Sequence, residues 1–189
     1  MRDESEEAVE RFLTSLGLDL KKLNMEKTPN RVSRLYQDLF SGLGKKTEDV
    51  WGEVFPTDYS GLVAITKIPV YSVCEHHLMP FFGTVDIIYH PKDGRVVGLS
   101  KMRDLVEVLS RRPQLQERLT AQIADAIEQD LEADGVFIHM QCTQLCMLIR
   151  GEMELGSQAI TVEGRGVLSQ DGPFRQEAIT ILGGQKHDV

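Results

Sequence analysis

The order of apolar patterns along this sequence predicts an α+β fold with an antiparallel sheet. Apolar residues recur at helical spacing in two early segments, and β-branched runs follow over residues 62–90. Two further helical patterns then precede a second set of β-branched runs over residues 136–168. Helices, strands, two helices and strands in this order are typical of an α+β domain rather than of alternating βαβ units.

The first 60 residues are expected to form an N-terminal helical region, ahead of one structural unit over residues 61–189. The first helix spans residues 6–16 and ends at Gly17, and the second begins with Thr28 as its N-cap and Pro29 at its first helical position. Its inward side chains are predicted to be Val32, Leu35, Tyr36, Leu39 and Phe40. Residues 43–60 are a charged loop in which Trp51 and Phe55 are expected to anchor the packing.

The second unit begins with β-branched strands and continues through a helix pair. Ser100 is predicted to cap a helix that ends at the Arg-Arg-Pro sequence of residues 111–113, and a second helix follows from Gln114 to about Leu131. The side chains expected to be buried on this pair are Leu105, Val106, Leu109, Leu115, Leu119, Ile123, Ala126 and Ile127. Strands are then predicted over residues 136–150 and 159–168, and a short helix over residues 173–182.

Composition excludes several classes of function. The net charge of −8 disfavours a general binder of nucleic acid or of a membrane surface, since both need a basic face. No apolar run approaches the roughly 20 residues needed to span a bilayer. The acidic N-terminal sequence has no apolar core of the kind found in signal peptides. Together with an odd number of cysteines, three, this indicates a reducing compartment, so we expect a cytoplasmic protein.

The sequence CEHH at residues 74–77 is the first candidate site. Cys74 and His77 are three residues apart, close enough in a turn to bind one ion, although a surface turn with solvated histidines would show the same spacing. Strand alternation places Cys142, Gln144 and Cys146 on one face of the predicted strand, so Cys146 could complete a Cys₂His set. Three protein ligands with one open position are typical of catalytic zinc, whereas the alternative is that both downstream cysteines are small buried hydrophobes.

Five motifs, in one order, resemble the signature of the GTP cyclohydrolase I family. They are CEHH followed by PFFG, VVGLSK, RRPQLQERLT and QLCMLIRG, and the resemblance runs from about Glu6 to the C-terminus, KTPNRV included. It implies a tunnelling fold, in which an antiparallel sheet carries two helices on one face and is preceded by N-terminal helices. It also implies a homodecamer of two face-to-face pentamers with active sites at subunit boundaries.

The resemblance implies a reaction that converts GTP and water to 7,8-dihydroneopterin triphosphate and formate. Zinc would be the cofactor, and GTP or a related purine nucleotide the small-molecule partner. The positions that match the family's functional residues are Cys74, His77 and Cys146 as zinc ligands, His76 and His77 in catalysis, and Glu117 with Gln116 at the guanine edge. Ser100, Lys101, Arg150 and Arg31 match residues around the ribose and triphosphate.

Three positions depart from the family pattern. Gln144 stands where the family has a catalytic histidine, and an amide cannot exchange a proton as imidazole does. Asp104 stands where the family has an arginine, on the helical face of Lys101. The usual Thr/Ser-rich strand reads Ala-Ile-Thr-Val-Glu over residues 159–163, which adds the carboxylate of Glu163.

These departures leave two alternatives beside the leading hypothesis of a zinc-dependent GTP cyclohydrolase I. One is a divergent paralogue that acts on another purine nucleotide or stops at the ring-opened intermediate. The other is a non-catalytic binding or assembly protein that keeps the zinc.

Overall fold

The structure is a computed structural model that describes residues 3–184. Its contacts divide the chain into two compact units, with the division between Ser41 and Gly42, and each unit is described by itself. The predicted domain boundary between residues 60 and 61 stays a prediction, because a division by contacts does not test which segments fold together. Among the described residues, no helix has the length and apolar content of a bilayer-spanning segment.

The N-terminal unit consists of α1 (Glu4–Ser15) and α2 (Thr28–Leu39). Asp3 caps α1, since its carboxylate accepts a hydrogen bond from the Ser5 backbone N–H. Two predictions for α2 are wrong: Lys27, not Thr28, is the N-cap, and Leu35 is 53% exposed rather than buried. Two short helices have only one mutual interface, so part of an amphipathic apolar face stays uncovered.

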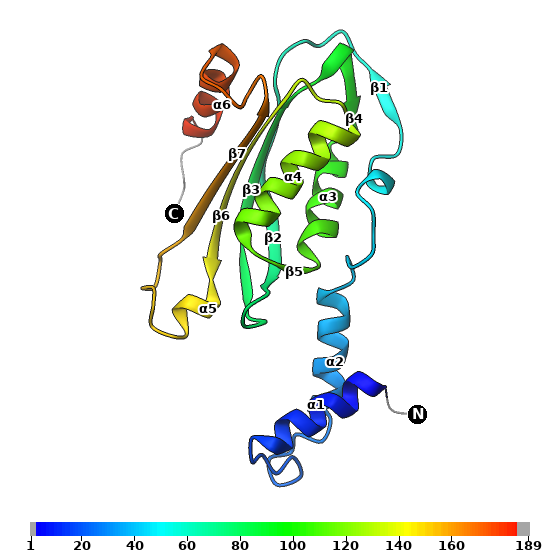
Figure 1. Ribbon diagram of the computed structural model, residues 1–189, viewed down its shortest axis with the longest axis vertical. Coiled ribbons are helices and arrows are strands. Elements are labelled where there is room, and N and C mark those ends of the chain that lie inside the picture. Colours follow the sequence, from blue (N-terminus) through cyan, green and yellow to red (C-terminus); the bar gives the residue numbers. More distant parts are fainter. Residues whose placement is uncertain (1–2, 185–189) are drawn as a thin grey trace. The chain divides into compact units, whose positions relative to one another are not determined.

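The second unit is built on a five-stranded sheet with the strand order β5-β2-β3-β6-β7 (Figure 1). The central strands are antiparallel, and the short β5 pairs parallel with the end of β2. The strands are β2 (Val63–Cys74), β3 (Pro80–His90), β5 (Pro113–Gln114), β6 (Gly135–Gln144) and β7 (Ala159–Gly166), with β1 (Val54–Pro56) and β4 (Arg95–Val97) in a separate two-stranded sheet.

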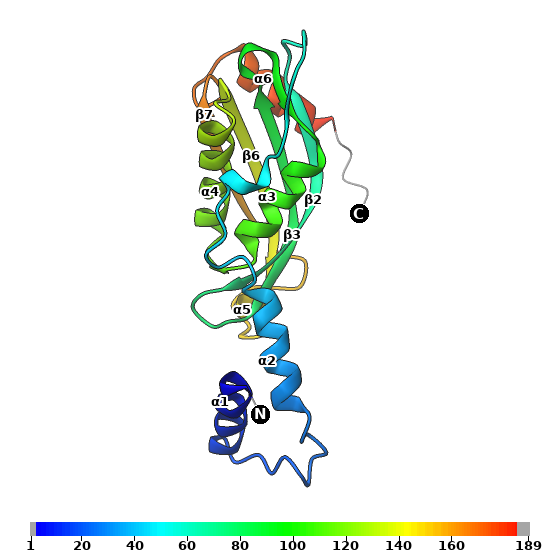
Figure 2. The same ribbon diagram turned by 90° about the vertical axis from the view of Figure 1, so that its right-hand side faces the viewer.

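Two helices, α3 (Ser100–Ser110) and α4 (Gln116–Asp130), lie side by side on one face of this sheet (Figure 2). α6 (Pro173–Gly183) packs against Ile88 and Phe137, which alternate with the helix-facing Ile87 and Ile138 and therefore belong to the opposite face. The remaining helical segments are η1 (Glu48–Val50), η2 (Lys92–Gly94) and α5 (Leu145–Leu148). The predicted α+β fold with two helices on one face of an antiparallel sheet is confirmed.

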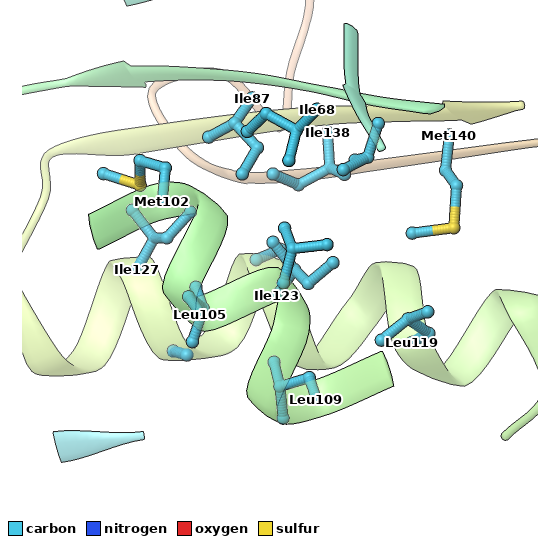
Figure 3. Packing of buried hydrophobic residues seen from close by; sticks show 14 of the residues in the cluster. Ile68, Ile87, Met102, Leu105, Leu109, Leu119, Ile123, Ile127, Ile138 and Met140 are labelled. Carbon is cyan, nitrogen blue, oxygen red and sulfur yellow. The ribbon is translucent and has the colours of Figure 1, made fainter. Parts of the chain in front are cut away.

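The main core fills the space between the helix pair and the sheet (Figure 3). The labelled side chains are Ile68, Ile87, Ile138 and Met140 from the sheet, Met102, Leu105 and Leu109 from α3, and Leu119, Ile123 and Ile127 from α4. Each is at most 5% exposed, so the helical spacing predicted the buried stripes of α3 and α4 correctly. Leu115 is the exception, since it precedes α4 as its N-cap and is only half-buried. Trp51 is buried as expected, but Phe55 is 46% exposed because β1 belongs to the two-stranded sheet.

Three local predictions in the second unit are wrong. The helix predicted to begin at Gln114 begins at Gln116, because Pro113 and Gln114 pair with the end of β2 as β5. The strand predicted to run to residue 150 ends at Gln144, where its partner β3 also begins, and the chain continues into α5 because the ladder offers no further pairing. Ser100 is the first residue of α3 rather than its cap, since Leu99 is the N-cap and no side chain caps the helix.

Candidate metal and substrate site

The structure brings Cys74, His77 and Cys146 together at one end of the sheet. Cys74 ends β2, His77 lies in the turn that follows, and Cys146 lies in α5. Their ligand atoms are all within 4.8 Å of one another, close enough for one ion to bind all three. Both cysteines are buried and the histidine is exposed, so this group faces solvent on one side.

The turn between β2 and β3 holds two of these ligands. The Cys74 N–H donates to the Met79 carbonyl at 2.9 Å, and the Leu78 N–H donates to the Cys74 carbonyl at 2.9 Å. Leu78 adopts a φ of +53°, a left-handed conformation that a non-glycine residue rarely takes and that reverses the chain here. Backbone hydrogen bonds therefore define the turn that carries the Cys-x-x-His pair.

A second set of contacts fastens this turn to the beginning of α4. Arg118 forms an ion pair with Glu75, one of the two residues between Cys74 and His77. Its Nε also donates to the side-chain oxygen of Gln114 at 2.9 Å, and its Nη2 donates to the Pro113 carbonyl at 3.0 Å. The Glu75 N–H in turn donates to the Gln114 carbonyl at 3.1 Å. Sequence reasoning missed Arg118 and Gln114, although their i, i+4 spacing within the RRPQLQERLT motif was a usable signal.

Gln144 takes part in a chain of amide hydrogen bonds that leads away from the metal ligands. Its Nε2 donates to Oε1 of Gln116 at 2.7 Å. Nε2 of Gln116 lies within 3.0 to 3.3 Å of the carbonyl oxygens of Met140 and Ala159 and of the Thr161 hydroxyl. Gln116 is only 4% exposed, and both ends of its amide are engaged inside the chain. It is therefore placed to orient Gln144.

Charge around the ligands is unevenly distributed. Burial, and secondarily the nearby Cys74 thiol, raise the pKa of Cys146. Arg150 lies with Nη1 3.2 Å from Nε2 of His77, and its Nη2 is 2.6 Å from the carboxylate of Glu152. His76 is exposed on the same turn. Arg150 therefore lies beside the exposed His77, and the His76 ring centroid is 6.3 Å from that of His77.

Two further predicted residues, Ser100 and Lys101, lie at the other end of α3. The Ser72 hydroxyl donates to the carbonyl of Ser110 at the C-terminal end of that helix, and Ser72 is two residues from Cys74. An α-helix rises about 1.5 Å per residue, so the first turn of α3 lies roughly 15 Å along the axis from this contact. One chain therefore does not bring Ser100 and Lys101 to the metal ligands.

Glu117 is exposed in the first turn of α4, next to the buried Gln116. Arg31 is exposed on α2 in the N-terminal unit, so its predicted phosphate contact stays a prediction. Asp104 is 3.7 Å from the Lys101 ammonium, and Glu163 pairs with Arg165 at 2.7 Å. The fold and this site define an α+β protein with a Cys-His-Cys group suited to a metal ion and open to solvent.

Comparison with known proteins places this chain in a family. The profile of the GTP cyclohydrolase I family matches residues 5–183. A GTP cyclohydrolase 1 of Streptococcus agalactiae serotype V is 42% identical over 181 residues, which cover 96% of this chain and 97% of that protein. A GTP cyclohydrolase 1 of Streptococcus mutans serotype c is 44% identical over 177 residues, or 94% of this chain and 92% of the relative. The chain belongs to the GTP cyclohydrolase I family.

A solved structure, the crystal structure of the archaeosine synthase QueF-Like in the apo form, shows a weaker likeness. It is 18% identical with a TM-score of 0.46, and the match covers 58% of this chain and 97% of that one.

Proposed function

We propose that this protein is a zinc-dependent GTP cyclohydrolase I, which converts GTP and water to 7,8-dihydroneopterin triphosphate and formate. The observation that carries the proposal is the Cys74, His77 and Cys146 group, with donor atoms within 4.8 Å, in a chain of this family. Two thiolates and an imidazole are a donor set that suits zinc, and three protein ligands leave one coordination position open. Bound zinc would supply an activated water for attack on the purine ring.

The residues around the ligands have distinct proposed roles. His76, exposed beside the ligand turn, exchanges protons with the substrate, because an imidazole titrates near neutral pH. Glu117 accepts hydrogen bonds from N–H groups at the guanine edge. Arg150, beside His77, contacts the phosphates, as its fork of N–H donors suits.

A homodecamer that acts in the cytoplasm is part of the proposal. The metal ligands and the Ser100–Lys101 pair lie toward opposite ends of α3, so a neighbouring copy could bring the second set to the first. β7 is at the edge of the sheet, with Ile160 and Val162 58% and 46% exposed, and such an edge favours pairing with another chain. The free cysteines suit a reducing compartment.

A second candidate function rests on the amide chain from Gln144 to Gln116. An amide held in this way cannot exchange protons, so later steps that need an acid or base at position 144 would be slow. The protein would then release the ring-opened nucleotide, or act on another purine nucleotide, instead of making the pterin.

Metal analysis and a product assay test these proposals together. We expect about one zinc per subunit, lost or strongly weakened in Cys146→Ala and retained in the matched variant Cys142→Ala, whose cysteine lies outside the ligand group. With GTP, pterin fluorescence together with formate supports the leading proposal, whereas ring-opened nucleotide without pterin supports the second. A folded, metal-free protein that converts no purine nucleotide would refute both.

A further inference from the structure

A pocket of about 340 Å³ lies along α3, on the side where the segment after Gly42 runs past the helix. It is within the range of about 300 to 1,000 Å³ that is usual for small-molecule sites. Its lining residues are Lys45, Lys46, Asp49, Val50, Lys101, Asp104 and Val108. Three lysines against two aspartates give this pocket a positive charge in a chain whose net charge is −8.

The segment that carries Lys45 and Lys46 is held against α3 at its first end. The Gly42 N–H donates to the Arg111 carbonyl at 2.9 Å. Arg112 donates from Nε to the Gly42 carbonyl at 2.9 Å and from Nη2 to the Lys45 carbonyl at 2.6 Å. A Cβ on Gly42 would lie 2.1 Å from a backbone oxygen of α3, so only glycine permits this approach.

The second end of the segment is anchored in the core. Val50 and Trp51 are 8% and 5% exposed, and the Trp51 indole N–H donates to Asp130 of α4 at 2.9 Å. The two lysines therefore lie on a short segment fixed at both ends, which limits the conformational entropy lost when they bind a ligand.

The three lysines of the pocket differ in whether a carboxylate lies within ion-pair distance of them. The Lys101 ammonium is 3.7 Å from the Asp104 carboxylate, and Arg103 also contacts this carboxylate at 3.2 Å. Within residues 3–184, neither Lys45 nor Lys46 has a carboxylate within ion-pair distance. The positive charge left for an incoming anion thus comes mainly from Lys45 and Lys46.

We propose that Lys45 and Lys46 bind the phosphate chain of the nucleotide substrate in this pocket and offset the carboxylate of Asp104 beside Lys101. This inference rests on the proposed function, which supplies a nucleoside triphosphate as substrate. Lysine ammonium groups bind phosphates as point charges, and a polyanion gains more from several of them than a monophosphate does. The pocket would therefore favour triphosphates over nucleosides.

Calorimetric titration with inorganic tripolyphosphate tests the pocket without any turnover. We expect Lys45→Ala/Lys46→Ala to weaken tripolyphosphate binding at least tenfold and to reduce its salt dependence. The matched control is Lys21→Ala/Lys22→Ala, which removes a second tandem lysine pair, with Lys22 84% exposed in the N-terminal unit, and should change binding less than twofold. Asp104→Asn should strengthen binding a few-fold. Circular dichroism of each variant checks that the fold is kept.

Equal losses in both double-alanine variants, or no loss in Lys45→Ala/Lys46→Ala, would overturn the proposal. With GTP as substrate, this variant should raise KM while kcat changes less than twofold. A drop in kcat at unchanged KM would also contradict a phosphate-binding role. If wild-type protein binds tripolyphosphate through Lys45 and Lys46 but makes no pterin, the phosphate site stands and the proposed function fails.

Discussion

Replacing Gln144 by histidine is expected to raise the rate of pterin formation while zinc content stays the same. In the structure, Gln144 Nε2 donates to Gln116 Oε1 at 2.7 Å. A histidine at this position can donate one ring N–H to the same oxygen, which fixes its tautomer and leaves the other nitrogen free to exchange a proton. Gln116 cannot turn away, because its own amide N–H groups are engaged with Ala159 and Thr161.

The size of this gain follows from the chemistry of the two side chains. General acid–base help is worth about 10²- to 10⁴-fold, which corresponds to roughly 2.7 to 5.4 kcal/mol of activation free energy. An amide supplies none of this acid–base help, so Gln144→His should raise the rate of pterin formation by about 10²-fold or more. The stability cost should be small, because the hydrogen bond to Gln116 is kept and the site is only half-buried.

The assay is a single-turnover measurement of pterin fluorescence and formate at saturating GTP. Gln144→Met serves as control, since it keeps the length of the side chain but can neither donate nor exchange a proton, and it should show no gain. Adding Gln116→Met to Gln144→His should remove much of the gain by freeing the imidazole. A folded, zinc-loaded Gln144→His protein with wild-type pterin output would contradict a proton-transfer role for position 144.

Three further predictions test the site and its supporting structure. Arg118→Met should weaken zinc binding about 10- to 100-fold in a chelator competition, because the ion pair of Arg118 with Glu75 ties the ligand turn to α4. The control Arg95→Met removes a surface ion pair and should leave the zinc affinity unchanged. Burial raises the pKa of the Cys142 thiol from 9.0 to about 12, so at pH 8 its thiolate fraction is about 10⁻⁴. Peptide mapping after iodoacetamide should therefore find Cys142 unlabelled in the native protein, and rapid labelling would contradict its burial. As the pH rises from 9 to 12 the thiol ionises first in the unfolded state, so Cys142 lowers the free energy of unfolding in that range. Ile123→Ala should cost about 2 to 5 kcal/mol in urea unfolding, since the side chain is fully buried between α4 and the sheet, and a loss below 1 kcal/mol would contradict that packing.

Local patterns in the sequence predicted most of the secondary structure. The helical spacing of apolar residues identified the buried faces of α3 and α4, because burial against a single sheet requires one apolar stripe per helix. β-branched runs identified β2 and β3, because β-branched side chains pack well on a pleated, half-buried surface. The same spacing misled at Leu35, since it reports an amphipathic face but not whether anything covers that face.

The sequence predicted that Cys74, His77 and Cys146 lie together, but it assigned a wrong local structure to Cys146. Strand alternation was extended to Cys146, yet the residue lies in a short helix after the strand ends at Gln144. The grouping of Cys146 with Cys74 and His77 is nevertheless present. Alternation is a property of a paired strand, and nothing in residues 145–150 themselves shows where the partner strand stops.

Residue types and their spacing were enough to predict the fold class, the family resemblance and a group of candidate metal ligands at Cys74, His77 and Cys146. Only the tertiary structure showed what surrounds them. Gln116 turns inward to hold Gln144, Arg118 ties the ligand turn to α4, and Lys45 lies beside α3. Such contacts join residues far apart in the chain, and their formation depends on how the sheet and helices pack.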